Sequence, residues 1–377
     1  MSFGIYIHWP FCLSKCPYCD FNSHVANGID QPGWRAALLS ELAHFAQQTQ
    51  GREVTSIFFG GGTPSLMEPA TTAALLDKIA ALWPVSPGVE ITLEANPGTI
   101  DAARFRDFRA AGVNRLSMGL QALDDESLRF LGRKHDSAQA VQAVELAHAI
   151  FPRISFDLIY ARPGQSAEDW RLELAMALAM AADHLSVYQL TIEEGTAFHP
   201  AHARGDFVLP DEDEAAEMFD LTQELCAAAG LPAYEVSNHA RPGAECRHNL
   251  LYWQGDDYIG IGPGAHGRLN GQAVRQFKTP DRWRQAVAEH GHGTQEQTPL
   301  SFEERRDELV MMGLRLTEGL DAARFARITG QPLEPSLDPA GLALMLQDGF
   351  AEWRHGALRA TAPGRLVLNS VIATLLP

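Results

Sequence analysis

The sequence has few cysteines, few basic residues and no long apolar run, and each shortage excludes a class of protein. Its five cysteines are too few, and odd in number, for a disulfide framework, so we expect a reducing compartment, the cytoplasm. Its 30 Lys and Arg residues stand against 47 Asp and Glu residues, and the net charge of −17 disfavours nucleic acid as a partner. The longest apolar stretches, at 174–182 and 366–377, are too short to cross a bilayer, and no signal peptide is visible.

Composition and periodicity predict a folded α/β protein. Hydrophobic residues make up 46% of the 377 positions, as in globular chains, and the length suits one large and one small domain. Short apolar runs alternate with segments of helical period, which predicts parallel strands with right-handed crossovers. Six such units are too few to close an eight-stranded barrel, so we expect an open, partial (β/α)6 barrel of the TIM type. The expected strands are at 3–8, 54–59, 90–94, 113–118, 154–159 and 184–190, and the expected helices at 33–48, 70–82, 101–111, 137–150 and 166–182.

The second half of the chain predicts a smaller unit of different architecture. An acidic helix at 211–229, a strand at 233–237 and a glycine-rich stretch at 255–267 come first. After residue 319, short helical pieces lead into two short strands across the turn residues His355 and Gly356, a pattern typical of a winged helix. Its mixed charges favour packing or partner docking over DNA binding. We expect boundaries at 1–240 for the barrel, 241–300 for a connecting segment and 301–377 for a small α+β winged-helix-like domain.

Three of the cysteines, Cys12, Cys16 and Cys19, lie within eight residues directly after the first expected strand. Such clustering in a cysteine-poor chain needs a chemical reason. One interpretation is a zinc site completed by His8 or His24, since structural zinc takes four ligands. The other is an iron–sulfur cluster, in which three thiolates hold three irons and the fourth iron has no protein ligand.

The spacing Cys-x3-Cys-x2-Cys, with Tyr18 before the third cysteine, resembles the signature of the radical S-adenosylmethionine superfamily. The resemblance implies a [4Fe–4S] cluster whose open iron is chelated by S-adenosylmethionine and which reduces its sulfonium to give a 5′-deoxyadenosyl radical. It also implies that the partial barrel is of the radical-S-adenosylmethionine type. A radical of this kind needs a site that excludes water, as the mouth of a barrel does.

Polar residues follow the ends of the expected strands, where parallel α/β folds bind ligands. Physically, Glu94 can pair with an ammonium, Gln121 and Asp157 can bond hydroxyls, and Arg133 can hold a carboxylate, although each alone could be a solvated rim residue. The chain resembles the subgroup of oxygen-independent coproporphyrinogen oxidases and their relatives over nearly its whole length. This resemblance implies the following adenosylmethionine contacts: Tyr6, Gly62, Thr63, Glu94, Gln121, Arg133 and Asp157.

Two features distinguish members of that subgroup. Phe21 stands where the decarboxylating enzyme has a further cysteine, and that enzyme has a segment before its first strand for which this sequence shows no counterpart. The motif His248-Asn249-x-x-Tyr252-Trp253 resembles instead the haem chaperones of the HemW family. The resemblance implies haem as a further cofactor, with His248 as axial ligand and aromatic faces over the macrocycle.

The ligand of the haem iron stays open between several residues. From composition alone, His248 is better interpreted as a loop residue that only makes hydrogen bonds. Cys246 offers a thiolate two positions earlier, and His239 and His266 offer competing imidazoles.

Our leading hypothesis is a haem chaperone that binds haem and transfers it to acceptor proteins, which by family resemblance include respiratory-chain haem proteins. The alternative is an enzyme, an oxygen-independent coproporphyrinogen III oxidase that decarboxylates propionates. A zinc-structured interaction protein is a third class. The sequence leaves open whether the chain is an enzyme and whether it forms a homodimer.

Overall fold

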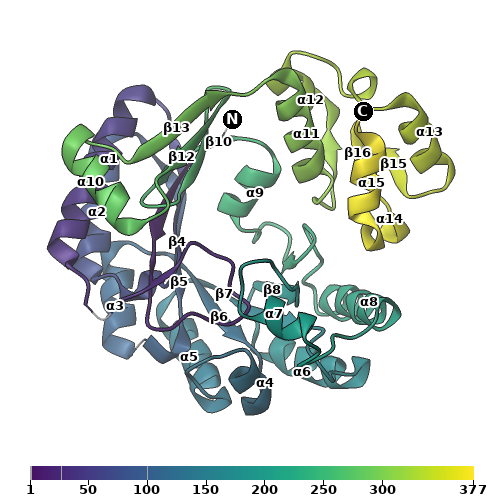
Figure 1. Ribbon diagram of the computed structural model, residues 1–377, viewed down its shortest axis with the longest axis horizontal. Helices are drawn as coiled ribbons and strands as arrows, with labels where there is room; N and C mark the ends of the chain where they lie inside the picture. The colour runs from purple at the N-terminus through teal and green to yellow at the C-terminus, as the bar shows by residue number, and fades with distance from the viewer. Residues whose placement is uncertain (1, 27, 100) are drawn as a thin grey trace.

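A mixed sheet of eleven strands forms the body of the computed structural model, which describes residues 2–26, 28–99 and 101–377 (Figure 1). The strand order is β13-β12-β11-β10-β1-β4-β5-β6-β7-β8-β9. The six expected strands lie side by side in this sheet, all parallel, and together they confirm the partial barrel. They are β1 (Phe3–Trp9), β4 (Val54–Gly61), β5 (Val85–Ala95), β6 (Arg115–Gln121), β7 (Arg153–Tyr160) and β8 (His184–Gln189).

Amphipathic helices cover the outer side of the curved sheet, while α9 lies on its inner side (Figure 1). Most of these helices begin after a side chain that accepts a backbone N–H, such as Asp136 from Gln139 and Ser166 from Asp169. Each helix turns an apolar stripe inward, which on α1 includes Trp34. The helices of this half are α1 (Gln31–Gln48), α2 (Pro69–Leu82), α3 (Ala102–Ala111), α4 (Asp125–Phe130), α5 (Ser137–Ile150), α6 (Ala167–Met180), α7 (Phe198–Ala203) and α8 (Glu212–Ala228).

The strand expected at 233–237 is wrong in position, because the last strand on this edge is β9 (Asn238–Ala240), antiparallel to β8. The Glu235 carboxylate accepts the backbone N–H of Ser237 at 3.2 Å and also bonds the Asn238 amide. The Tyr234 N–H bonds the Asn238 carbonyl at 3.1 Å. The apolar run therefore folds into a turn rather than a ladder.

Four strands extend the other edge beyond β1. The first, β10 (Asp257–Ile261), is parallel to β1, and the following three are antiparallel. They are β11 (His266–Leu269), β12 (Gln272–Gln276) and β13 (Thr294–Pro299), accompanied by the helices α9 (Arg247–Trp253) and α10 (Pro280–His290). None of the described helices is long and apolar enough to cross a bilayer.

The C-terminal part has its own apolar core around Val310, Phe325 and Leu358 and its own antiparallel sheet, as the expected α+β unit requires. The order of that sheet is β14-β16-β15. The domain boundaries expected from the sequence stay a prediction. The elements are α11 (Phe302–Gly313), β14 (Leu320–Asp321), α12 (Ala322–Thr329), α13 (Pro339–Gln347), β15 (Ala351–Arg354), β16 (Ala357–Ala360), α14 (Ala362–Leu366) and α15 (Leu368–Leu375).

A buried carboxylate on α1 ties this helix to the later strands, and its loss tests the fold. Glu41 accepts the backbone N–H groups of Gly262 and Gly293, both at 2.7 Å, and the Trp283 indole N–H at 3.1 Å. Each donor left unpaired costs roughly 1–3 kcal/mol, so we expect Glu41→Ala to lower the free energy of unfolding by at least about 3 kcal/mol. Urea denaturation measures the loss. The exposed Glu53→Ala is the matched control, and equal stability of the two variants would contradict the role of Glu41.

Candidate functional site

The three clustered cysteines lie on a loop held at both ends by backbone pairing. The two-residue strands β2 (Phe11–Cys12) and β3 (His24–Val25) pair in parallel and close the loop between them. All three thiols are half-buried and line one cavity of about 180 Å³. Each has a polar neighbour: Thr63 Oγ1 donates to Cys12 Sγ at 3.4 Å, Arg133 donates to Cys16 Sγ at 3.5 Å, and Ser23 Oγ lies 3.9 Å from Cys19 Sγ.

The glycine-rich end of β4 fixes this loop through the backbone. The Gly62 N–H bonds the Trp9 carbonyl at 2.7 Å, and the Thr63 N–H bonds the Phe11 carbonyl at 2.8 Å. A Cβ at Gly62 would lie 2.7 Å from the Phe11 carbonyl oxygen, and Gly61 has a φ of +113°. Only glycines allow the two backbones to approach so closely.

The predicted adenosylmethionine residues come together around the cysteines at the ends of β4, β5, β6 and β7. Tyr6 differs, because it lines a neighbouring cavity and its hydroxyl lies 3.0 Å from His8 Nδ1. His248 lines neither of these two cavities. The predicted residues that share the cavity with Cys12, Cys16 and Cys19 are Tyr18, Gly62, Thr63, Glu94, Gln121, Arg133 and Asp157.

Burial raises the pKa values of two carboxyl groups in this cavity. Burial first, and then the charge of Asp157, raise the pKa of Glu94 from 4.5 to about 8, although the Gly61 N–H donates to its Oε2 at 3.2 Å. Burial raises the pKa of Asp157 from 3.8 to about 6, opposed by a hydrogen bond from Ser186 and by nearby arginines. The nearby arginines offset only part of the effect of burial, so the pKa values of both carboxyl groups stay raised.

Two further groups in this cavity are buried without a partner. Within the described chain, Gln121 Oε1 and Arg133 Nε make no hydrogen bond, and Gln121 has a φ of +77°. Buried polar atoms are normally paired, and strained backbone of this kind gathers at ligand sites. Carboxyl groups, a free amide oxygen and a free guanidinium N–H fit the ammonium, hydroxyl and carboxylate groups of an amino-acid nucleoside such as S-adenosylmethionine.

Ser117 and Asn96, which the sequence pattern did not single out as ligand contacts, also line this cavity. Ser117 lies on the same face of β6 as Gln121, so the two-residue period of that strand could have indicated it. Its hydroxyl accepts a hydrogen bond from Ser155 at 3.0 Å, and Ser155 accepts one from Arg115 at 2.8 Å.

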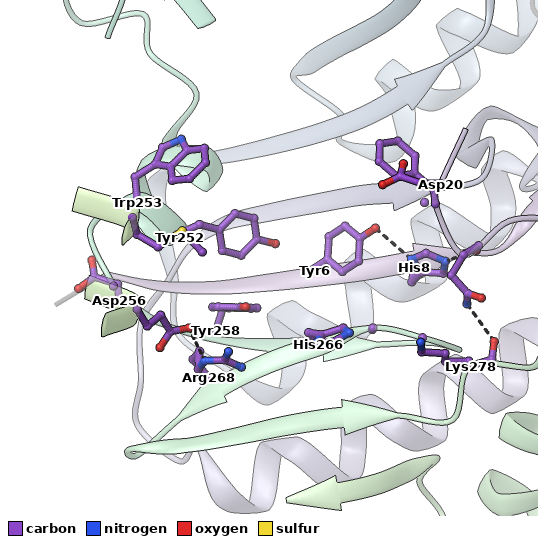
Figure 2. Close-up of a pocket in the computed structure, with 18 of the residues that line it drawn as sticks. Tyr6, His8, Asp20, Tyr252, Trp253, Asp256, Tyr258, His266, Arg268 and Lys278 are labelled. Atoms are coloured by element: carbon purple, nitrogen blue, oxygen red, sulfur yellow. Dashed lines mark hydrogen bonds and ion pairs between the residues drawn. The ribbon is translucent and has the colours of Figure 1, made fainter. Parts of the chain in front are cut away.

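A larger cavity of about 770 Å³ adjoins the first one (Figure 2). Lys15, Phe21, Gly61 and Glu94 line both cavities. This cavity lies between the strands β1 and β4, which lead to the cysteine site, and the later elements β10, β11, α9 and α11. Besides Lys15 and Phe21, its aromatic, imidazole and basic residues are Tyr6, His8, Tyr252, Trp253, Tyr258, His266, Arg268, Lys278 and Arg305.

Most of the histidines that the sequence suggested as zinc or haem ligands form hydrogen bonds within the protein. His8 Nε2 lies 2.9 Å from the Asn22 carbonyl, and His24 Nε2 lies 3.3 Å from Asn22 Oδ1. His248, 1% exposed, has Nδ1 2.9 Å from Ser56 Oγ and Nε2 2.7 Å from the Tyr252 hydroxyl. Among the residues that the structure describes, no group of three His, Cys, Asp or Glu side chains is arranged to hold a metal ion.

The raised pKa of Glu94 makes the free energy of unfolding depend on pH. Because its pKa is raised to about 8, the folded chain binds this proton more tightly than the unfolded chain does. Folding therefore becomes less favourable as the pH rises from about 4.5 to about 8. We expect Glu94→Gln, without ligands, to be more stable than wild type by about 1–3 kcal/mol near pH 8.5 and to lose this advantage near pH 5. Urea unfolding at both pH values measures this, and a difference that does not grow with pH would contradict it.

Comparisons with known proteins agree with this architecture. The Radical SAM superfamily model matches residues 6–176, and the HemN C-terminal domain model matches residues 300–367. A solved structure of coproporphyrinogen III oxidase (HemN) from Escherichia coli superposes with a TM-score of 0.82 at 23% identity, covering 99% of this chain and 89% of that one. At this identity the likeness concerns the fold.

Curated relatives match at higher identity. The heme chaperone HemW of Escherichia coli is 39% identical over 99% of this chain and 98% of its own length. The mitochondrial radical S-adenosyl methionine domain-containing protein 1 of Mus musculus is 40% identical over 99% of this chain and 87% of its own. The chain therefore belongs to the radical S-adenosylmethionine superfamily and, within it, to the family of the haem chaperone HemW.

Proposed function

We propose that this chain is a haem chaperone, which binds a [4Fe–4S] cluster, S-adenosylmethionine and haem and transfers the haem to acceptor proteins. One observation carries the proposal: a cavity of about 770 Å³, within the range of cofactor sites, shares a wall with the cavity of the three cysteines. The name of the Escherichia coli relative supports the same function.

In this proposal Cys12, Cys16 and Cys19 hold the cluster, which supplies one-electron chemistry when it is bound. The other residues of the smaller cavity hold S-adenosylmethionine. The unpartnered N–H of Arg133 binds its carboxylate, and the buried carboxyl of Glu94 receives its ammonium. Gln121 and Asp157 bond the ribose hydroxyls, the backbone at Gly62 and Thr63 contacts the ligand closely, and Tyr6 and Tyr18 pack beside it.

The larger cavity is the proposed haem site. Tyr252 and Trp253 of the haem-type motif line it together with Tyr258, and they would cover the macrocycle. Lys15 and Lys278 also line it, and neither forms an ion pair with a carboxylate of the described residues. They can therefore receive the two propionates. The sequence offers His248, Cys246, His239 and His266 as axial ligands, and none of them is tested by this cavity alone. The cytoplasmic location and the acceptor proteins stay predictions.

The test is anaerobic reconstitution of the purified protein, followed by haem titration and transfer to an apo-haem protein. We expect about four irons per chain in the cluster, one haem per chain and transfer to the acceptor. Cys16→Ala should lose the cluster, whereas the buried Cys226→Ala should keep it. We expect no conversion of coproporphyrinogen III, and multiple turnovers to protoporphyrinogen IX would establish the decarboxylase instead.

The backbone contact at Gly62 provides a separate prediction. A methyl group there would press on the Phe11 carbonyl and displace the loop that carries Cys12. We expect Gly62→Ala to bind well under half of the wild-type iron and sulfide after reconstitution. Gly88→Ala is the control, because among the described residues the one neighbour of its added Cβ within 4 Å is an Arg247 nitrogen at 3.6 Å. Full cluster content in Gly62→Ala would show that the contact is dispensable.

A further inference from the structure

The four side chains that the sequence offers as ligands of the haem iron differ in exposure. Cys246 and His239 are 0% and 1% exposed, and Cys246 donates to Glu90 at 3.5 Å. His248 is equally buried, with both ring nitrogens within hydrogen-bond distance of hydroxyl groups. His266 is exposed and lines the cavity. It is therefore the one of the four whose ring an iron in the cavity can reach.

The backbone around His266 aims the ring into the cavity. Along β11 the side chains alternate, so that His266 and Arg268 face the cavity while Gly267 and Leu269 are buried. Figure 2 shows His266 and Arg268 on this strand, with His266 facing Tyr6 of β1.

The loop before His266 is held at several points. The Gly264 N–H bonds the Phe277 carbonyl at 2.9 Å, and the Asn22 amide donates to the Pro263 carbonyl at 3.0 Å. Glu41 accepts the Gly262 N–H at 2.7 Å. The imidazole thus stands on a rigid support, as a metal ligand requires.

The protonation states favour His266 over the phenols of the same cavity. Burial and the charges of Arg275, Arg268 and Lys278 lower the pKa of His266, which keeps the ring neutral and able to ligate iron. Neither ring nitrogen makes a hydrogen bond within the part of the chain that the structure describes. Burial raises the pKa values of the three tyrosines, so they stay protonated and are poor ligands.

His248 has a different geometric role. Its Nε2 lies 2.7 Å from the Tyr252 hydroxyl, and the Tyr252 ring packs edge-on against Tyr258 with centroids 4.6 Å apart. Ser56 holds the other nitrogen at 2.9 Å. His248 thus fixes the orientation of an aromatic ring in the cavity wall from behind.

We propose that His266 is the axial ligand of the haem iron and that His248 is a positioning residue that holds Tyr252 against the macrocycle. This inference rests on the proposed haem binding. The haem-type motif then supplies the aromatic wall of the cavity, and the iron ligand comes from β11, outside the motif.

The experiment compares haem and metal-free protoporphyrin IX binding to the full-length protein with its reconstituted cluster. Removing a residue that only orients a ligand typically lowers metal affinity about 10- to 100-fold, so His266→Ala should weaken haem binding at least about tenfold. Its Soret band should shift, added imidazole should restore the band, and protoporphyrin IX affinity should stay unchanged. His248→Gln should keep the wild-type Soret position and weaken both macrocycles alike. The exposed His290→Ala is the control.

Each outcome decides between the assignments. An unchanged Soret band in His266→Ala, or a shifted one in His248→Gln, overturns the inference while haem binding itself stands. Equal loss of both macrocycles in His266→Ala, without imidazole rescue, makes His266 a wall residue and also overturns it. Absence of haem uptake by the wild-type protein with an intact cluster contradicts the proposed function and removes the inference with it.

Discussion

The contact between the end of β4 and the cysteine loop is the constraint on which the rest of the site depends. Two backbone hydrogen bonds, from Gly62 to Trp9 and from Thr63 to Phe11, join the loop to the sheet where the parallel strands end. They are short because glycine leaves room for a carbonyl oxygen where a Cβ would stand. The thiols therefore face the carboxyl ends of β5, β6 and β7, where the unpartnered polar groups lie.

The shared wall of the two cavities places the proposed haem site next to the cysteine site. The same sheet extends past β1 through β10 and β11, so the larger cavity opens beside the cysteines rather than at a distant surface. Phe21 lies at this boundary, and Glu94 is within reach of both spaces. A ligand in one cavity would change the electrostatics of the other, because buried charges interact through a medium of low dielectric constant.

The sequence predicted the parallel strands and the cysteine site because both depend on local patterns. Buried parallel strands read as continuous apolar runs, and the three cysteines lie within one loop. It did not predict β10, because the glycines of this strand are typical of a turn. In the structure Gly260 lies within the strand, where a Cβ would collide with the His266 carbonyl. It did not separate His248 from His266, because only the folded chain shows which imidazole is buried behind Tyr252.

The proposed function requires that haem binds in the cavity that shares a wall with the cysteine site. Pulsed electron paramagnetic resonance of the reduced cluster, before and after loading with copper-substituted protoporphyrin IX, tests it most directly. We expect a strong dipolar interaction, with faster relaxation of the cluster signal, because one wall separates the two sites. If a stoichiometric amount of bound porphyrin left the relaxation of the cluster signal unchanged, the macrocycle would bind elsewhere and the proposed haem site would be wrong.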